Sequence, residues 1–267
     1  MYKIGWEATY GYGDILGAYC HSSRTSHVRK ENVNLEFWWY KDRPFYPPQN
    51  KFHPQDPESV LERVELIQKF VDIKDVEITH KDLPEYTGEI RKRERFLNRG
   101  EIGWESTLWK MKDQPEDLGH FAVWSSRTNK EDYRTHILKH WKVPYTYDEF
   151  DNFVNNIQKA SGKTPIYVDY RMPVKEVFEI IRTSSFCVGN DGIGNVISKN
   201  YFKPIIVTSK DTHLSKTHAG PWAFIINKKE REYDIQKQNL ANYFVNVEIE
   251  NQKEAINVYR KSFTELL

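Results

Sequence analysis

The chain has 267 residues, with 39 Lys and Arg against 38 Asp and Glu, and a formal net charge of +1. That length accommodates one large domain or two small ones, and we expect two small domains with a cleft between them. Nonspecific nucleic-acid binding needs a basic face, so the balanced charge predicts that nucleic acid is not a partner.

The first half of the chain predicts a βαβ unit. Apolar residues alternate with polar ones at 2–6 and 33–39, which is typical of strands, and a Gly-rich segment leads from the first strand into apolar residues at helical spacing. Asp56 followed by Pro57 predicts the start of a second helix. A short strand is expected at 76–78. The pattern then weakens, and we place the domain boundary between 1–118 and 119–267.

The second half alternates strands and helices more clearly. This alternation predicts a parallel sheet with helices on both faces, and therefore an α/β fold. Thr146 and Glu149 form a capping box that opens one helix, and Asn251 with Glu254 predicts the start of the last one. Strands are expected at 121–124, 166–168, 186–188, 204–207 and 222–226, and further helices at 173–181 and 193–201.

The two cysteines, Cys20 and Cys187, lie far apart and have no His or Cys ligands at metal-binding spacing. Neither a disulfide framework nor a structural zinc site is expected, and a reducing environment fits best. The N-terminal sequence has no apolar core of a secretion signal, and no segment is long and apolar enough to cross a bilayer. We therefore expect a soluble, cytoplasmic protein.

The run 186–195, Phe-Cys-Val-Gly-Asn-Asp-Gly-Ile-Gly-Asn, is the most informative stretch. A strand, a Gly-rich turn and a helix N-terminus form an anion site, because backbone N–H groups and the helix dipole point at the incoming charge. The expected ligand is the phosphate of a nucleotide or nucleotide-sugar. The run has neither the dinucleotide fingerprint nor the P-loop spacing. A structural alternative stays open, in which Asp191 is only an N-cap and the glycines only meet turn geometry.

Two further loops follow strands of the same predicted sheet, and ligands of open α/β sheets bind at the carboxyl ends of strands. The loop after 121–124 carries Ser126, Arg127 and Lys130, a set that suits a diphosphate because guanidinium pairs bidentately with phosphate oxygens. The loop after 166–168 carries Asp169, which fits a ribose or base. Solvated loop residues remain the alternative for the basic pair, and a structural role the alternative for Asp169.

Three motifs, taken in order, resemble those of GT-B glycosyltransferases, and most nearly those of the bacterial heptosyltransferase-like enzymes of glycosyltransferase family 9. They are Gly13-Asp14-Ile15-Leu16, Ser126-Arg127 with Lys130, and Val188-Gly189-Asn190-Asp191-Gly192. The resemblance implies two Rossmann-like domains that face each other across a cleft. The acceptor would lie on the first domain and the nucleotide-diphosphate sugar on the second, with the C-terminal helix crossing back.

Carried over by position, Asp14 would be the general base that deprotonates the acceptor hydroxyl, and Gly13 would lie beside the acceptor. The resemblance implies inverting transfer that needs no metal and no cofactor. An ordinary helix N-cap is the alternative for Asp14. The residues implied to bind the donor are Ser126, Arg127, Lys130, Asp169, Asp191, Gly192, Gly194 and Asn195.

The chain also departs from the family pattern. A His usually follows the Asp-x-Gly turn, whereas here the sequence reads Gly194-Asn195, and the chain is shorter than usual. These departures favour a second hypothesis, a non-catalytic GT-B-like protein that binds a glycan or a nucleotide. His213 and His218 are further candidates for proton transfer or phosphate contact, with a solvated loop as the alternative. A nicotinamide-dependent oxidoreductase is disfavoured, because no Gly-x-Gly-x-x-Gly turn follows the first strand.

Overall fold

The protein is an α/β chain with parallel sheets. It divides into two compact units, Met1–Asp113 and Gln114–Leu267, and each has a sheet of its own. The expected domains 1–118 and 119–267, and a cleft between them, stay predictions. The structure is a computed structural model, and it describes residues 1–6, 12–40, 57–72, 76–83, 111–124, 147–168, 172–189, 192–209, 220, 222–227 and 249–266.

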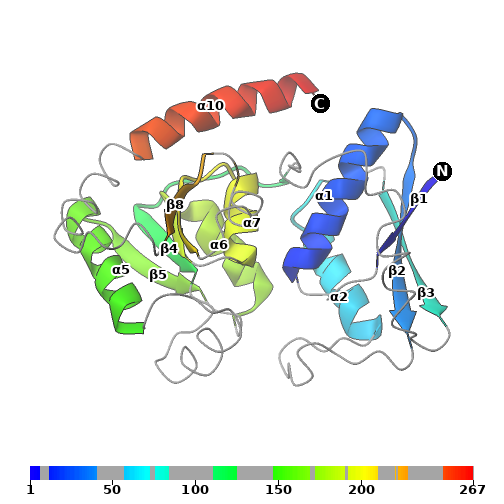
Figure 1. The fold of residues 1–267 in the computed structure, drawn as a ribbon, viewed down its shortest axis with the longest axis horizontal. Coiled ribbons are helices and arrows are strands. Elements are labelled where there is room, and N and C mark those ends of the chain that lie inside the picture. Colours follow the sequence, from blue (N-terminus) through cyan, green and yellow to red (C-terminus); the bar gives the residue numbers. More distant parts are fainter. Residues whose placement is uncertain are drawn as a thin grey trace. The chain divides into compact units, whose positions relative to one another are not determined.

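The first unit contains a three-stranded parallel sheet in the order β1 (Tyr2–Trp6), β2 (Val33–Tyr40) and β3 (Val76–Leu83). Helix α1 (Tyr12–Arg29) connects β1 to β2, and α2 (Pro57–Gln68) lies between β2 and β3 in the chain. Figure 1 shows both helices alongside this sheet. The predicted βαβ unit is confirmed, and β3 is longer than the predicted strand at 76–78.

Apolar spacing explains how α1 packs. Ile15, Leu16 and Tyr19 are all buried, because residues three and four apart lie on one face of a helix. In β2 the buried residues Val33, Leu35 and Phe37 follow the period of two that a strand imposes. Their joint burial forms the core of the first unit.

The second unit contains a five-stranded sheet in the order β5-β4-β6-β7-β8, in which every neighbouring pair is parallel. This arrangement confirms the predicted alternation of strands and helices in the second half. The strands are β4 (His120–Trp124), β5 (Thr164–Val168), β6 (Cys187–Gly189), β7 (Ile205–Ser209) and β8 (Phe224–Asn227); the helices are α5 (Tyr147–Ser161), α6 (Val174–Thr183), α7 (Ile193–Asn200) and α10 (Ile249–Leu266).

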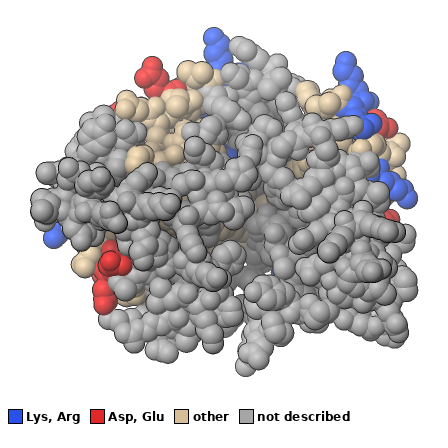
Figure 2. Space-filling model, viewed as in Figure 1, with Lys and Arg blue, Asp and Glu red and all other residues tan. Residues whose placement is uncertain are grey.

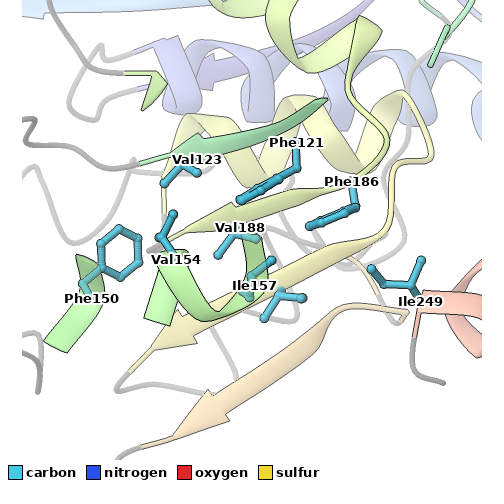
Figure 3. Packing of buried hydrophobic residues seen from close by; sticks show 9 residues of the cluster. Phe121, Val123, Phe150, Val154, Ile157, Phe186, Val188 and Ile249 are labelled. Carbon is cyan, nitrogen blue, oxygen red and sulfur yellow. The ribbon is translucent and has the colours of Figure 1, made fainter. Parts of the chain in front are cut away.

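One face of this sheet packs against α5. Phe121 and Phe186 stack at a centroid distance of 4.9 Å with ring planes 8° apart, and Val154 and Ile157 of α5 pack into the same cluster. Figure 3 shows these side chains pointing toward one another, with Ile249 at the edge of the cluster. Full burial of such a side chain contributes about 1.5–3 kcal/mol, so this cluster is a main source of stability.

The opposite face of the sheet is lined by the alternate residues of the same strands. Because side chains of a strand alternate between faces, Ala122 and Trp124 lie opposite to Phe121. Cys187 and Gly189 of β6 are on this second face for the same reason. Trp124 contacts α7 there, and α6 and α7 contact each other.

The first residues of the second unit are held to the end of α6. Arg182 donates hydrogen bonds to the carbonyl of Gln114 and to Glu116 Oε1, both at 2.9 Å, and it also pairs with Glu179. Backbone N–H groups of Glu116 and Leu118 bond to the carbonyls of Arg182 and Thr183. These contacts fix the chain just before β4 begins.

Helix α10 begins at Ile249, two positions before the predicted cap Asn251, so that prediction is wrong in register. Ile249 is buried in the hydrophobic cluster between the sheet and α5 that contains Phe121 and Phe186, whereas Asn251 is exposed. Gln252 Oε1 accepts a hydrogen bond of 3.0 Å from the backbone N–H of Ile205 at the start of β7. The first turn of α10 is therefore part of the second unit's core.

The surface of the described residues carries both signs of charge. On the face drawn in Figure 2, both Lys and Arg side chains and Asp and Glu side chains of the described residues are visible. Among the helices that the structure describes, none has the length and apolar character needed to cross a membrane.

Candidate functional site

The strand order of the second unit creates a topological switch point between β4 and β6. The chain passes from β4 to β5 on one side, and then returns across β4 to form β6 on the other. In open α/β sheets the crevice outside the carboxyl ends of two such strands is the usual place for a ligand. Trp124 and Gly189 end β4 and β6, and they are direct partners in the register of the sheet.

Trp124 packs on the turn that follows β6. A Cβ at Gly194 would lie 2.5 Å from Cγ of Trp124 and 2.6 Å from its Cβ, and a Cβ at Gly192 would lie 3.1 Å from Cε2 and closer still to Nε1. Real Cβ atoms essentially never approach other atoms within 3.0 Å. Gly189 meets the backbone of Trp124 in the same way. A side chain at any of these three positions would overlap Trp124, so the three glycines leave the space that its backbone and indole occupy.

The N-terminus of α7 lies in this turn. Its N-cap residue is Gly192, which has no side chain that could cap the helix. The backbone N–H of Asn195 bonds to the carbonyl of Gly192 at 3.1 Å, which closes the first turn. The remaining N–H groups of a first helical turn have no partner within the helix, and they carry the positive end of its dipole. An anion would be stabilised at this position.

The indole of Trp124 is buried at this point with 8% of its surface exposed. Its Nε1 is a buried donor without a hydrogen-bond partner in the part of the chain that the structure describes. Leaving a buried donor unsatisfied costs about 1–3 kcal/mol, so a buried donor in a native protein normally has a hydrogen-bond acceptor. For Trp124 Nε1 that acceptor is not among the described residues.

Of the residues predicted to bind a donor, the structure brings Gly192, Gly194 and Asn195 together in the turn and first turn of α7. Gly194 and Asn195 are buried, and Gly192 is partly buried. The N-cap position is occupied by Gly192 rather than by Asp191. The candidates that lie outside the described residues are Ser126, Arg127, Lys130, Asp169, Asp191, His213 and His218.

The two acceptor-side candidates, Gly13 and Asp14, lie in the first turn of α1 in the first unit. That helix follows β1, so this turn is at the carboxyl end of the first sheet, where α/β folds place ligand-binding loops. Helix α1 begins at Tyr12, which makes Asp14 its third residue and not its N-cap. Their side-chain contacts are outside what the structure describes, and the role of Asp14 stays a prediction.

Trp124 is a candidate site residue that the sequence pattern identifies only as the end of a buried strand. The one signal in the sequence was a large aromatic residue at the end of a buried strand, directly before a polar loop. Its link to the glycines of the turn depends on the pairing of Trp124 with Gly189 across two strands. That pairing is not local in sequence, so periodicity does not reveal it.

A polar cluster at the other end of the sheet is structural. Lys203 donates to the carbonyls of Ser184, at 2.5 Å, and Glu116, and burial lowers the pKa of its ammonium group. Burial likewise raises the pKa of the Cys187 thiol, which keeps it protonated and a poor nucleophile. These groups lie at the amino ends of β6 and β7, at the opposite end of these strands from the switch point.

No group of three or more His, Cys, Asp or Glu residues able to hold a metal ion occurs among the described residues. The expectation of metal-independent chemistry stays a prediction.

A scan against protein-family models finds no match, and no curated protein sequence matches the chain. Two solved structures are similar to it over 97% of its length, at 9% sequence identity. One is the iron-containing dodecameric glycosyltransferase TibC from enterotoxigenic E. coli H10407, of which 76% is covered at a TM-score of 0.46. The other is the dodecameric iron-containing heptosyltransferase TibC in complex with ADP-D-beta-D-heptose, covered to 75% at a TM-score of 0.45. At this level of likeness no residue role passes from these proteins to the chain.

Proposed function

We propose that the chain is a glycosyltransferase of GT-B type that moves a sugar from a nucleotide-diphosphate donor to an acceptor hydroxyl. The observation that carries the proposal is the switch point of the second unit. A helix N-terminus with glycine at its N-cap, a glycine turn and a buried indole N–H meet there at the carboxyl ends of β4 and β6. This arrangement suits the diphosphate of a nucleotide-sugar, since it offers donors to negative charge.

The donor-binding domain of the proposal is 119–267, and the acceptor-side domain is 1–118. Arg127 and Lys130, with Ser126, supply fixed positive charge and a hydroxyl to the diphosphate, while Asp169 contacts the ribose or base. The backbone N–H groups from Gly192 to Asn195 complete the phosphate site. The C-terminal helix crosses back to the first domain, and the reaction takes place in the cytoplasm without a metal or cofactor.

Asp14 is the general base of the proposed reaction. Its carboxylate accepts the proton of the acceptor hydroxyl as that oxygen attacks the anomeric carbon. The bond between the anomeric carbon and the diphosphate oxygen breaks in the same step, and the electron pair leaves with the nucleoside diphosphate. Attack opposite the leaving group inverts the anomeric configuration. Fixed donors at the α7 N-terminus stabilise the charge that develops on the leaving diphosphate.

A panel of nucleotide-sugars tests the proposal, with release of the nucleoside diphosphate as the readout. Asp14→Asn should lower turnover by about 100-fold or more, because general base catalysis of this kind contributes about 10²–10⁴-fold. Asp113→Asn is the matched control, since Asp113 is an exposed carboxylate outside the proposed site. Full turnover in the Asp14 variant would remove the base assignment, and no turnover with any donor would remove transfer.

A non-catalytic binding protein is the second candidate function. Asn195 occupies the position at which the family pattern has a His, and it is buried with 1% of its surface exposed. A buried amide there does not supply the proton-transfer group that a His offers. Calorimetry separates the two functions, because a binding protein would hold a glycan or nucleotide without consuming any nucleotide-sugar.

A further inference from the structure

We infer that Trp124 is a phosphate-binding residue, whose indole Nε1–H donates a hydrogen bond to a phosphoryl oxygen of the bound nucleoside diphosphate. The inference rests on the proposed function and adds a ligand contact that the motifs of the sequence do not indicate. It depends on three properties of the indole, namely its orientation on the glycine turn, its buried nitrogen without a partner among the described residues, and its position beside a helix whose N-cap is glycine.

The orientation of the indole is fixed by the two glycines beneath it. The atoms of Trp124 that approach Gly194 are Cβ, Cγ and Cδ2, whereas the atom that approaches Gly192 most closely is Nε1. The ring therefore lies lengthwise on the turn, and its nitrogen is at the end that precedes α7. An anion held by the first-turn N–H groups of α7 would occupy the space beyond that same end.

The nitrogen lacks a protein partner in the part of the chain that the structure describes. Nε1 of Trp124 is buried and forms no hydrogen bond with any described residue. An indole N–H is a donor only, so its partner must be an acceptor. The neighbouring backbone N–H groups of Ile193 and Gly194 are also donors, and they do not satisfy it. An acceptor that meets the indole and the helix together has to be shared by several donors, as a phosphoryl oxygen is.

Packing alone explains the presence of an aromatic ring but not the choice of an indole. A Phe at position 124 would keep an aromatic ring against Gly192 and Gly194 and would bury no unpaired donor. The indole and the phenyl ring therefore differ in the property that the inference invokes, which is the N–H group.

The test compares Trp124→Phe with Trp222→Phe by titration calorimetry. Trp222 is a buried indole of the same unit that stacks on Phe202 before the amino end of β8, so its replacement controls for the loss of a buried indole. The probes are inorganic pyrophosphate, the nucleoside diphosphates ADP, UDP and GDP, and the corresponding nucleosides. Circular dichroism establishes that each variant is folded before titration.

Trp124→Phe should weaken pyrophosphate and the preferred nucleoside diphosphate about tenfold, as expected for the loss of one hydrogen bond to a charged group. It should leave the affinity for the free nucleoside unchanged. Trp222→Phe should bind all probes within about twofold of the wild-type protein. Equal binding of diphosphates by the wild-type protein and Trp124→Phe would overturn the inference and leave the proposed function standing.

If the wild-type protein binds none of the diphosphates, the proposed function fails and the inference fails with it. A second measurement does not require the variant to fold. In ¹⁵N-labelled wild-type protein, the Trp124 indole N–H resonance, assigned by its contacts with Gly192 and Gly194, should shift when pyrophosphate is added and exchange more slowly with solvent. A resonance that stays in place while pyrophosphate binds would overturn the inference.

Discussion

The indole ring of Trp124 lies on Gly192, so close that a Cβ at position 192 would stand 3.1 Å from Cε2 and nearer still to Nε1. Trp124 ends β4, whereas Gly192 is the N-cap of α7, the helix that follows β6, and the two residues meet because β4 and β6 are neighbours. The small residue of the turn and the large residue of the strand therefore act as one packing unit, which shapes the phosphate site that we propose.

This contact predicts strong coupling between the two positions. Gly192→Ala should destabilise the protein by about 1–3 kcal/mol, because the added methyl group overlaps the ring. Trp124→Leu removes the ring atoms that it would meet. In a double-mutant cycle measured by chemical denaturation, Gly192→Ala should therefore cost about 1 kcal/mol less in the Trp124→Leu background. Additive effects would show that the ring does not restrict position 192.

Arg182 predicts a second stability effect. Its guanidinium, with 14% of the side chain exposed, bonds to the carbonyl of Gln114 and pairs with Glu116 and Glu179. Arg182→Ala should lower the free energy of unfolding by about 1–2 kcal/mol, since several charge-assisted bonds are lost together. The exposed pair Lys253–Glu250 is the control, and Lys253→Ala should cost less than about 0.5 kcal/mol. If Arg182→Ala and Lys253→Ala lowered the free energy of unfolding equally, the contacts of Arg182 would contribute no more to stability than an exposed ion pair.

Asp117 predicts a pH dependence. Burial alone would raise its pKa, but hydrogen bonds from Ser185 and from the N–H of Gly119, together with nearby Lys163 and Lys203, outweigh burial and lower the pKa below its ordinary value of 3.8. A lowered pKa adds stability that is complete above the unfolded value and is lost as the pH falls through the folded value.

Asp117→Asn removes that contribution. The difference in unfolding free energy between the wild-type protein and this variant should be largest above about pH 5 and should shrink as the pH falls below about 4. Unfolding curves measured at several pH values provide the check. A difference that stays constant through this acid range would show that the carboxylate is not stabilised in the folded state.

Gln252 predicts how α10 is attached. Its buried side chain accepts the hydrogen bond from the N–H of Ile205, which Gln252→Ala would leave unpaired at a cost of about 1–3 kcal/mol. Asn251→Ala, one position earlier on an exposed site, should change the stability by less than about 0.5 kcal/mol. Thermal unfolding of the two variants compares them directly. A larger effect at Asn251 would restore the sequence-based assignment of that residue as the cap.

Periodicity in the sequence predicted most elements of the fold because their burial is local in origin. The alternation of Val33, Leu35 and Phe37 defines β2, and the run at 121–124 defines β4. The start of α10 was misplaced because the contacts that extend it to Ile249 are with β7 and α5, which are distant in sequence. Local cap signals carry no information about such contacts.

The candidate site was predicted in part for the same reason. The Gly192 turn and the α7 N-terminus have a local signature, and the structure places both at the switch point. The role of Trp124 depends on the order β4-β6 and on the pairing of Trp124 with Gly189, and a single sequence contains no signal for either. The sequence therefore predicts the backbone of the phosphate site better than the side chains that line it.

The most direct test of the proposed function is a crystal structure of the protein with a bound nucleoside diphosphate. We predict that the phosphates lie beyond the carboxyl ends of β4 and β6, within hydrogen-bond distance of the N–H groups of Ile193 and Gly194 and of Trp124 Nε1. A diphosphate bound away from α7, with the Trp124 nitrogen facing no ligand atom, would contradict it.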